Sequence, residues 1–499
     1  MKIAFSRWFI ALAILSSPGL AGANTLTVTS TADSGAGSLR AALASASSGD
    51  TIDATGVSGT ILLTGGELLV SNNLTILGPG PNNLAVNGNA ASRVFYIGSN
   101  TVVSISSLTI NNGLVAATNY YPANSGGGIY NDHATLTVSN CSVSGNSAYT
   151  AGGILNESAS VSGAGSGSAT LIIVNSTVSA NSADLCGGIR NDGYAGNPSS
   201  SGNATLTIAN SSISGNTATN GSGVGIYNNG GFGYATMTIT NSTISGNSGD
   251  GVYSTGSYES VSNAAITMAD STISGNSGNG IYNAGGTVTI TNSALSGNSG
   301  GIYNSAYYGS ALITITGSTL NGNTGSGIYN NGASEEGYNY TAMVIIANSI
   351  VSSNSATSGG GIQNYGGYGY ATITIANSIL SGNSADNGSG GGINNDGIPY
   401  GTTTVTIFNS TLSGNWATNG SGGCIFNQNA TLTLSNCTVN GNWVEDGQAN
   451  EIFNNALGNA PNATLKIINS TLSSSNTAGT GWSDRVRTIK PESGATQSL

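Results

Sequence analysis

Most of this 499-residue chain alternates aliphatic and small polar residues in short blocks, arranged around a recurring word, Asn-Ser or a close variant. Four and two residues before each of twelve such words stand two aliphatic side chains, as at Val288 and Ile290, with mostly Thr beside them. A period of two with one apolar face predicts a β-strand. An aliphatic residue three positions after the word, such as Ile213, and the Ile of a Gly-Ile word, such as Ile281, predict two more short strands per repeat.

The repeat predicts a solenoid. Its words start 22 to 35 residues apart, and even the shortest interval must hold three strands and three turns. That content is typical of one coil of a parallel β-helix, with coils about 4.8 Å apart and the right-handed path of parallel crossovers. We therefore expect an all-β, single-stranded, right-handed parallel β-helix of about sixteen coils. Asn ends the Ile-Tyr-Asn word in eleven of twelve repeats, Ser254 being the exception, so stacked Asn side chains should form an amide ladder.

The two ends of the chain depart from the repeat. The stretch "GSLRAALASA" (37–46) places Leu39, Leu43 and Ala46 on one helical face, with Gly49 just beyond its end. Because the terminal coil of a solenoid exposes apolar core and unpaired backbone, we expect this helix to be a cap. The predicted organisation is an N-terminal cap and first coils at 24–125, repetitive coils at 126–476 and a C-terminal tail at 477–499.

The first residues predict export. Lys2 and Arg7 precede the apolar run "WFIALAIL" (8–15), and "AGA" (21–23) provides the small residues of a cleavage site, which together indicate a signal peptide at 1–23. We expect the mature chain to begin near Asn24 and to contain no transmembrane segment, since no other stretch approaches about 18 apolar residues. The expected location is extracellular or outer-membrane-associated, with the periplasm left open as an alternative.

Charge and cysteine content narrow the partners and the chemistry. Removing Lys2 and Arg7 leaves seven basic residues against 20 acidic ones, a formal charge of −13, so no basic stripe exists for nucleic acid. An exported chain can form disulfides, and four cysteines allow three pairings. Cys141 and Cys437 occupy a slot that usually holds Ser, so we favour buried, unpaired cysteines at these two positions. The other two are Cys186 and Cys424.

Two segments resemble known bacterial sequences. The order of "ISGN" followed by "GGIYN" is similar to the repeats of bacterial polymorphic outer membrane proteins. The opening "LTVTSTADSGAGSLRAALASASSGDTI" (26–52) resembles the segment that begins many bacterial exported right-handed β-helix proteins. Both resemblances imply a right-handed β-helix and export. Neither implies an activity, since fold does not fix function.

Three carboxylates are candidates for chemistry. Asp132, Glu157 and Asp192 directly follow the Asn of three successive words, with Arg190 and His133 at either end. Stacked in register, they would form a column at about 4.8 Å spacing, and like charges that close raise one another's pKa or attract a hard cation. We favour solvated turn positions with no resident cofactor. The alternatives are a weak calcium site, or a catalytic centre made by the three carboxylates with Arg190.

Tyrosine supplies the second candidate site. Tyr227, Tyr253, Tyr282, Tyr303 and Tyr329 each follow an inward Ile or, at Tyr253, Val252, so alternation points them outward, and neighbouring loops add more Tyr. A surface of Tyr, Ser, Gly and Asn has the chemistry of antibody combining sites, and sugar rings stack on such aromatics. The alternative is that stacked Tyr only covers the sheet.

These patterns favour a non-enzymatic function. We expect an exported surface or secreted, adhesin-like β-helix that binds glycans or other cell-surface polymers through its Tyr-rich face. The alternative is a polysaccharide lyase or glycoside hydrolase of the pectate-lyase-like β-helix type, centred on the three carboxylates and Arg190. The sequence leaves the assembly state and the ligand open.

Overall fold

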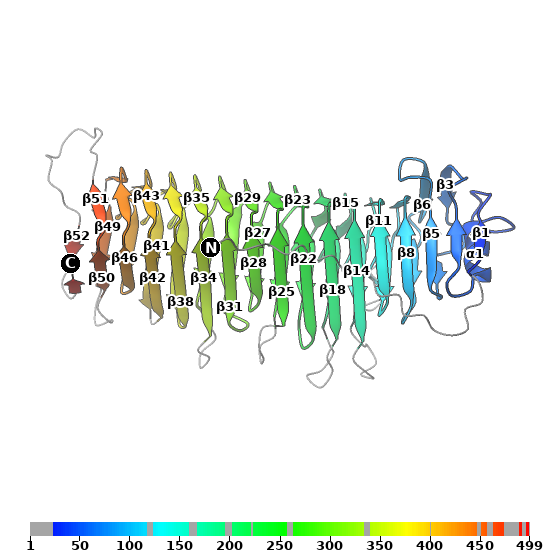
Figure 1. The fold of residues 1–499 in the computed structure, drawn as a ribbon, viewed down its shortest axis with the longest axis horizontal. Coiled ribbons are helices and arrows are strands. Elements are labelled where there is room, and N and C mark those ends of the chain that lie inside the picture. Colours follow the sequence, from blue (N-terminus) through cyan, green and yellow to red (C-terminus); the bar gives the residue numbers. More distant parts are fainter. Residues whose placement is uncertain are drawn as a thin grey trace, which may run out of the picture.

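The protein is a straight rod of stacked coils (Figure 1). The computed structural model describes residues 23–116, 123–158, 167–194, 202–220, 223–256, 263–333, 340–399, 401–446, 451–456, 463–473, 489–491 and 496–498. The predicted signal peptide, apart from residue 23, and most of the predicted tail lie outside these residues. The predicted right-handed parallel β-helix is confirmed: each coil contributes one strand to each of three long parallel sheets, here called A, B and C, which contain 17, 15 and 15 strands.

Sheet A contains the first strand of each coil. Its strands are β1 (Thr25–Thr27), β2 (Thr51–Asp53), β5 (Leu74–Leu77), β8 (Val102–Ser106), β11 (Thr135–Ser139), β14 (Ser168–Val174), β18 (Asn203–Ala209), β22 (Tyr234–Thr240), β25 (Ala264–Ala269), β28 (Thr287–Thr291), β31 (Ala311–Thr316), β34 (Thr341–Ala347), β38 (Tyr370–Ala376), β42 (Thr402–Phe408), β46 (Thr431–Ser435), β50 (Thr464–Ile468) and β53 (Thr496–Ser498).

Sheet B contains the second strand of each coil. Its strands are β3 (Gly59–Leu62), β6 (Leu84–Asn87), β9 (Thr109–Asn111), β12 (Ser142–Ser144), β15 (Thr177–Ser179), β19 (Ser212–Ser214), β23 (Thr243–Ser245), β26 (Thr272–Ser274), β29 (Ala294–Ser296), β32 (Thr319–Asn321), β35 (Ile350–Ser352), β39 (Ile379–Ser381), β43 (Thr411–Ser413), β47 (Thr438–Asn440) and β51 (Thr471–Ser473).

Sheet C contains the third strand. Its strands are β4 (Leu68–Val70), β7 (Phe95–Ile97), β10 (Ile129–Asp132), β13 (Ile154–Glu157), β17 (Ile189–Asp192), β21 (Gly223–Asn229), β24 (Asp250–Thr255), β27 (Asn279–Ala284), β30 (Gly300–Ser305), β33 (Ile328–Asn331), β37 (Ile362–Gly367), β41 (Ile393–Pro399), β45 (Ile425–Gln428), β49 (Ile452–Asn455) and β52 (Ile489–Pro491). Two small sheets extend the turns between B and C: β16 (Ser182–Ala183) with β20 (Thr217–Ala218), and β36 (Ser355–Ala356) with β40 (Ser384–Ala385), β44 (Trp416–Thr418) and β48 (Trp443–Glu445).

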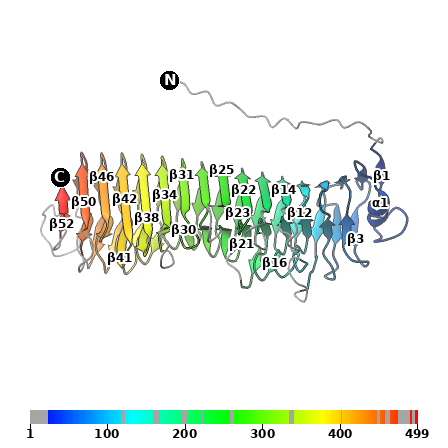
Figure 2. The same ribbon diagram turned by 90° about the horizontal axis from the view of Figure 1, so that it is seen from below.

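A short helix caps the N-terminal end, as the sequence predicts. Helix α1 (Leu39–Ser45) begins at Ser38, whose hydroxyl accepts a hydrogen bond from the Ala41 amide, and buries Leu39 and Leu43 against the first coil. Figure 2 shows α1 and β1 at one end of the rod and β50 and β52 at the other. At that far end β52 pairs with β49 and β53 with β50, so the predicted tail contributes two strands. No helix in the described ranges is long and apolar enough to cross a membrane.

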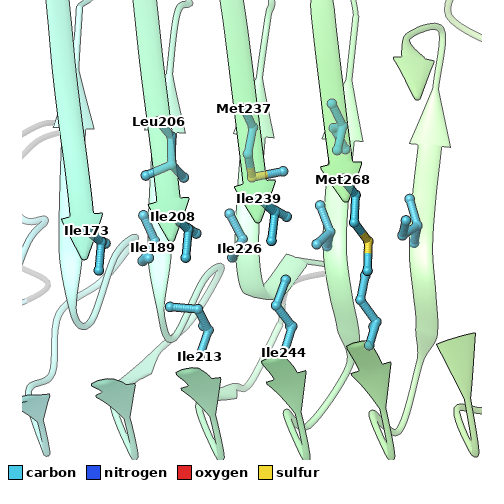
Figure 3. Close-up of a cluster of buried hydrophobic side chains, with 14 of the residues drawn as sticks. Ile173, Ile189, Leu206, Ile208, Ile213, Ile226, Met237, Ile239, Ile244 and Met268 are labelled. Carbon is cyan, nitrogen blue, oxygen red and sulfur yellow. The ribbon is translucent and has the colours of Figure 1, made fainter. Parts of the chain in front are cut away.

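The core is a column of aliphatic side chains enclosed by the three sheets. In β28 the burial alternates. Val288 and Ile290 are buried, and the Thr residues on either side of each are partly exposed, which confirms the predicted strand parity. Figure 3 shows how Ile208 of sheet A and Ile213 of sheet B, with Ile189 of sheet C nearby, point into the interior. Each coil therefore buries aliphatic residues from three directions, and each coil also packs on the next.

The corner between sheets A and B depends on left-handed Asn. The first residue of the Asn-Ser word adopts positive φ in most coils, for example 50° at Asn210 and 48° at Asn292. Asn tolerates this conformation better than other residues with a Cβ. Elsewhere Asp270 and Gly317 take the same place at 50° and 60°. The recurring word is thus the signature of a bend.

The other two Asn of each repeat have a different role, because they form two ladders inside the turns. In the first ladder the Nδ2 of the Asn that ends the Ile-x-Asn word donates to the Oδ1 of its counterpart in the next coil at 2.7–2.8 Å, which confirms the predicted ladder. Its members are Asn131, Asn156, Asn191, Asn228, Asn283, Asn304, Asn330, Asn364, Asn395, Asn427 and Asn454. Ser254 interrupts it.

The second ladder runs through the Asn of the Ser-Gly-Asn words and has no interruption. Its links measure 2.8–3.2 Å from Asn146 to Asn442, and every member is buried. The glycine before the inward Ile makes room for it: a Cβ at Gly251 would lie 2.9 Å from Nδ2 of Asn276. At the last rung Nδ2 of Asn442 donates to a carboxylate oxygen of Glu451 at 2.7 Å. Buried amides that satisfy one another contribute about 1 kcal/mol per bond.

All four cysteines are buried and unpaired. Cys141 and Cys437 occupy the Ser slot, as the sequence predicts, and their backbone amides donate to the hydroxyls of Ser176 and Ser470 in the next coil. Burial raises the pKa of the Cys141 thiol to about 11. The cysteines therefore fill core space as neutral side chains.

Candidate functional site

The outward face of sheet C carries the tyrosine ladder, defined here as Tyr227, Tyr253, Tyr282, Tyr303 and Tyr329. These residues come from β21, β24, β27, β30 and β33, and each lies in register with the next. Ring centroids are 4.7 Å apart for Tyr253 and Tyr282, 4.6 Å for Tyr282 and Tyr303, and 4.8 Å for Tyr303 and Tyr329. The predicted spacing of about one coil is therefore confirmed.

The rings from Tyr253 to Tyr329 stack on one another, with planes 9–30° apart, whereas Tyr227 meets Tyr253 edge to face at 5.2 Å. The planes of Tyr282 and Tyr303 differ by only 9°, and all five side chains are half-buried. Burial raises the pKa of Tyr227 to about 12, partly offset by Arg190, and it raises the pKa of the other ladder phenols as well. Because ring faces inside the ladder meet other rings, the ladder offers a ligand its ring edges and hydroxyls more than its faces.

Two arginines contact aromatic rings at the N-terminal end of the tyrosine ladder and in the coils before it. The guanidinium of Arg190 lies 5.1 Å from the ring centroid of Tyr227, and that of Arg93 lies 5.0 Å from Tyr130 and 5.7 Å from Tyr96. All three distances are typical of cation–π contacts. Arg93 also donates to Glu67 at 2.7 Å. These cations thus hold the aromatic rank in place and are engaged within the protein.

The acidic column is defined here as Asp132, Glu157 and Asp192. The structure brings the three together, since β10, β13 and β17 pair them directly: Asp132 with Glu157, and Glu157 with Asp192. The expectation that they are solvated turn residues is wrong, because Glu157 and Asp192 are fully buried. Asn229 continues the column and is also buried. Sequence spacing predicted the register, but burial depends on what lies over the turns.

Local hydrogen bonds engage Asp132. Asp132 accepts from Tyr96 at 2.5 Å and from Ser99 at 2.9 Å, and lies 2.5 Å from Nδ1 of His133. Burial opposes ionisation of Asp132, but the bonds from His133, Tyr96 and Ser99 outweigh it and lower the pKa of that carboxyl. The column is thus built around an ionised Asp132.

Asp192 is engaged in the same way. It pairs with Arg190 at 2.6 Å and accepts from the amide of Tyr194 at 3.0 Å and from Asn229 at 2.8 Å. The candidate catalytic base Arg190 is therefore already bonded to a candidate acid. Within the described ranges no group of three His, Cys, Asp or Glu side chains has the geometry to hold a metal ion. The calcium site stays a hypothesis.

Two buried acids, Asp250 and Glu451, were not predicted as site residues from the sequence. Burial raises the pKa of Asp250 to about 6, against hydrogen bonds from the backbone and side chain of Asn279. Burial likewise raises the pKa of Glu451 to about 7, against its bond from Asn442. Glu451 stands where most coils have Gly before the inward aliphatic residue and the preceding coil has Cys424, a departure that an alignment of the repeats could have revealed. The stacked pair Trp416 and Trp443 was also missed.

No protein-family model matches the chain, the polymorphic outer membrane protein repeats included, and no curated protein matches it. Similar solved structures include the catalytic unit of an alpha-1,3-glucanase from Streptomyces thermodiastaticus (15% identity, 94% of this chain and 70% of that chain covered, TM-score 0.40). A mannuronan C-5 epimerase A-module from Azotobacter vinelandii has 11% identity, with 95% and 99% covered and a TM-score of 0.36. PfbA, a surface adhesin of Streptococcus pneumoniae, has 13% identity, with 86% and 85% covered and a TM-score of 0.28. Similarity at this level concerns the fold alone.

Proposed function

We propose that the protein is an exported, adhesin-like β-helix that binds glycans or other cell-surface polymers through its Tyr-rich face and has no enzymatic activity. One observation carries the proposal: five tyrosines on consecutive coils form a continuous aromatic rank along the outer face of sheet C. A rank that repeats at the coil spacing suits a ligand that is itself a linear polymer. Many weak contacts on such a ligand add up through multivalency.

Sequence features support export and surface display. The basic residues Lys2 and Arg7, the apolar run at 8–15 and the small residues at 21–23 support a cleaved signal peptide. The resemblance of the Ile-Ser-Gly-Asn and Gly-Gly-Ile-Tyr-Asn words to polymorphic outer membrane protein repeats supports a bacterial surface or secreted location. A rigid rod with one chemically distinct face also suits a display role.

The test is retention without turnover. Purified mature protein is incubated with a panel of uronate-containing and neutral polysaccharides and with intact cells, and both bound protein and new reducing ends or unsaturated products are measured. We expect binding and no product. Failure to bind any polysaccharide or cell contradicts the proposal, and product formation favours the lyase or hydrolase alternative at the acidic column.

A matched pair of variants links binding to the aromatic rank. Changing Tyr253, Tyr282, Tyr303 and Tyr329 together to Ser should reduce binding sharply while far-ultraviolet circular dichroism stays rich in β-structure. The same four positions changed to Phe keep the stacked rings and serve as the control for folding. If the Ser variant unfolds, the ladder stabilises the fold and is not shown to bind a ligand. If it folds and binds normally, the ligand site lies elsewhere.

A further inference from the structure

A second group of tyrosines lies closer to solvent than the ladder. It is called here the exposed tyrosine row and consists of Tyr194, Tyr234, Tyr307, Tyr368 and Tyr370, whose exposed fractions are 38%, 54%, 41%, 51% and 42%. All five lie where a strand of sheet C turns into the next strand of sheet A, in the turns β17–β18, β21–β22, β30–β31 and β37–β38. Tyr258, Tyr338 and Tyr400 of neighbouring turns lie outside the described residues.

Exposure separates the row from the ladder in what each can offer a ligand. Ladder rings are half-buried and stack on one another at 4.6–4.8 Å over three successive pairs. Side chains of the row have about two-fifths or more of their surface in water. An exposed amphipathic ring gives a sugar both an apolar face and a hydroxyl. The row is therefore the part of the Tyr-rich face that a polymer meets first.

Ring contacts hold two members of the row in place. Tyr307 and Tyr308 form an edge-to-face pair with centroids 5.0 Å apart, and Tyr307 is the exposed member. Tyr307 follows β30, the strand that carries Tyr303 of the ladder, so the pair lies one turn away from the ladder along the chain. A second contact fixes the row at its N-terminal end, where the rings of Tyr194 and Phe232 are 6.0 Å apart.

The charges of this part of the chain select the class of polymer. From residue 191 to residue 465 the sequence contains no Lys or Arg, and the side chains there that are charged at neutral pH are Asp and Glu. A polyuronate or a sulfated glycan needs cations to compensate its charge, and like charges across an interface cost affinity. The cation nearest in sequence, Arg190, is paired with Asp192. A polyanionic glycan is therefore disfavoured on this surface, and of the neutral and anionic polysaccharides the neutral ones fit it better.

The length of the row fits several sugars at once. Six coil steps separate the turn that holds Tyr194 from the turn that holds Tyr370, counted from β17 to β37. At about 4.8 Å per step the row spans about 29 Å along the rod. A chain lying parallel to the rod axis can thus touch rings from four turns.

We infer that the exposed tyrosine row is the ligand-contact surface and that it takes an uncharged polysaccharide lying along the rod. This inference rests on the proposed function and goes further in naming the contacting residues and the ligand class. It also commits to a glycan over a protein partner, because uncharged, hydroxyl-rich turns pair with sugar hydroxyls.

The experiment compares neutral and anionic probes with the intact mature chain. Immobilised dextran, mannan and xylan are the neutral probes, and polygalacturonate and alginate are the anionic ones. We expect the wild-type protein to bind at least one neutral probe at similar strength in low and high salt, and to bind the anionic probes weakly. Stronger binding to an anionic probe, lost in high salt, overturns the ligand class while leaving the proposed function in place.

Variants then test the residues. Changing all five positions of the row to Ser should weaken neutral binding more than tenfold, since avidity depends on simultaneous contacts, whereas changing them to Phe should keep most of it. Tyr149→Ser is the matched control, because Tyr149 is 38% exposed but lies in the turn between β12 and β13. Should the fivefold Ser variant fold poorly, the double variant Tyr234→Ser, Tyr368→Ser replaces it.

Each outcome has one meaning. Wild-type binding that survives in the folded Ser variant overturns the inference and leaves the proposed function intact. Loss of binding in Tyr149→Ser as well points to a general surface effect and overturns it too. A wild-type protein that binds no polysaccharide, and instead binds only proteinaceous cell-surface material, removes the glycan inference together with the glycan part of the proposed function.

Discussion

The gap in the first asparagine ladder offers a sharp test of how the coils are held together. Ser254 lies in register between Asn228 and Asn283. Its hydroxyl lies 3.3 Å from Nδ2 of Asn228, against 2.7–2.8 Å for the amide links elsewhere in the ladder. On its other side Oδ1 of Asn283 is buried and accepts no hydrogen bond from the described residues. We predict that Ser254→Asn closes the gap and stabilises this part of the rod.

The magnitude follows from the two bonds that change. A buried acceptor without a donor costs about 1–3 kcal/mol, and a typical intramolecular hydrogen bond contributes about 1 kcal/mol net. Ordering the larger Asn side chain offsets part of the gain. The expected stabilisation is therefore about 1–2 kcal/mol. Neighbouring coils already accommodate Asn at this place, for example Asn304 and Asn330.

Local hydrogen exchange is the right assay, because a solenoid gains stability coil by coil and does not unfold in a single two-state step. A gain of one or two kcal/mol corresponds to a factor of about 5–30 in the opening equilibrium. Amides at 250–256 and 279–284 should therefore exchange about 5–30 times more slowly in Ser254→Asn. Exchange at the distant strand β46 should not change.

Two control variants make the result decisive. Asn304→Ser opens a new gap and should speed local exchange by a similar factor, while Ser254→Leu adds comparable volume without an amide and should not slow it. If Ser254→Asn exchanges at the wild-type rate although Asn304→Ser is destabilised, the gap is satisfied in another way and the reasoning from Asn283 is refuted.

Three further predictions concern the core, the acidic column and pH. Ile290→Asn should destabilise the protein by about 3–5 kcal/mol, through a buried unpaired amide and lost apolar burial, whereas Thr289→Asn should stay within about 0.5 kcal/mol; equal shifts in Tm would contradict the strand parity. Millimolar calcium should leave Tm unchanged because Asp132 and Asp192 are already engaged by hydrogen bonds and by the Arg190 ion pair, and a clear rise that disappears when Asp132, Glu157 and Asp192 all become Asn would show a calcium site. Because the folded-state pKa of Glu451 is raised from 4.5 to about 7, the native state binds the extra proton, so stability should fall as pH rises from about 4.5 to about 7; Glu451→Gln should flatten that dependence in thermal melts at several pH values.

The repeat pattern was sufficient to predict the fold, because each of its words has one structural meaning. Aliphatic residues at fixed distances from the bend give strand parity, and Val288 and Ile290 are buried as that rule requires. The ladder through the Ile-x-Asn words and the spacing of the tyrosine rings follow from stacking equivalent positions at the coil repeat. Neither prediction needs information about the loops.

The parts that the sequence did not predict depend on contacts across the surface. Burial of Glu157 cannot be derived from its slot, since the equivalent position is buried in some coils, as at Asn229, and only partly buried in others, as at Thr255. The orientation of stacked rings depends on rotamers that alternation alone does not specify. The role of Glu451 at the end of the second asparagine ladder could be predicted only by knowing where the ladder ends. Asn442 has no further Asn among the described residues to donate to, and donates to Glu451 instead.

The two amide ladders also give the rod a direction. In both, every Nδ2 donates toward the next coil, so the N-terminal end of the first ladder has a buried acceptor without a donor, Oδ1 of Asn131, and the second ladder ends on the carboxylate of Glu451. Between those ends the rungs are chemically equivalent, apart from Ser254 in the first ladder. Removing or duplicating a complete unit, such as the 22 residues from 270 to 291, therefore reconnects the same donors to the same acceptors. The rod can therefore lengthen or shorten during evolution by whole coils. The Asn131 acceptor at one end and the Glu451 carboxylate at the other stay in place.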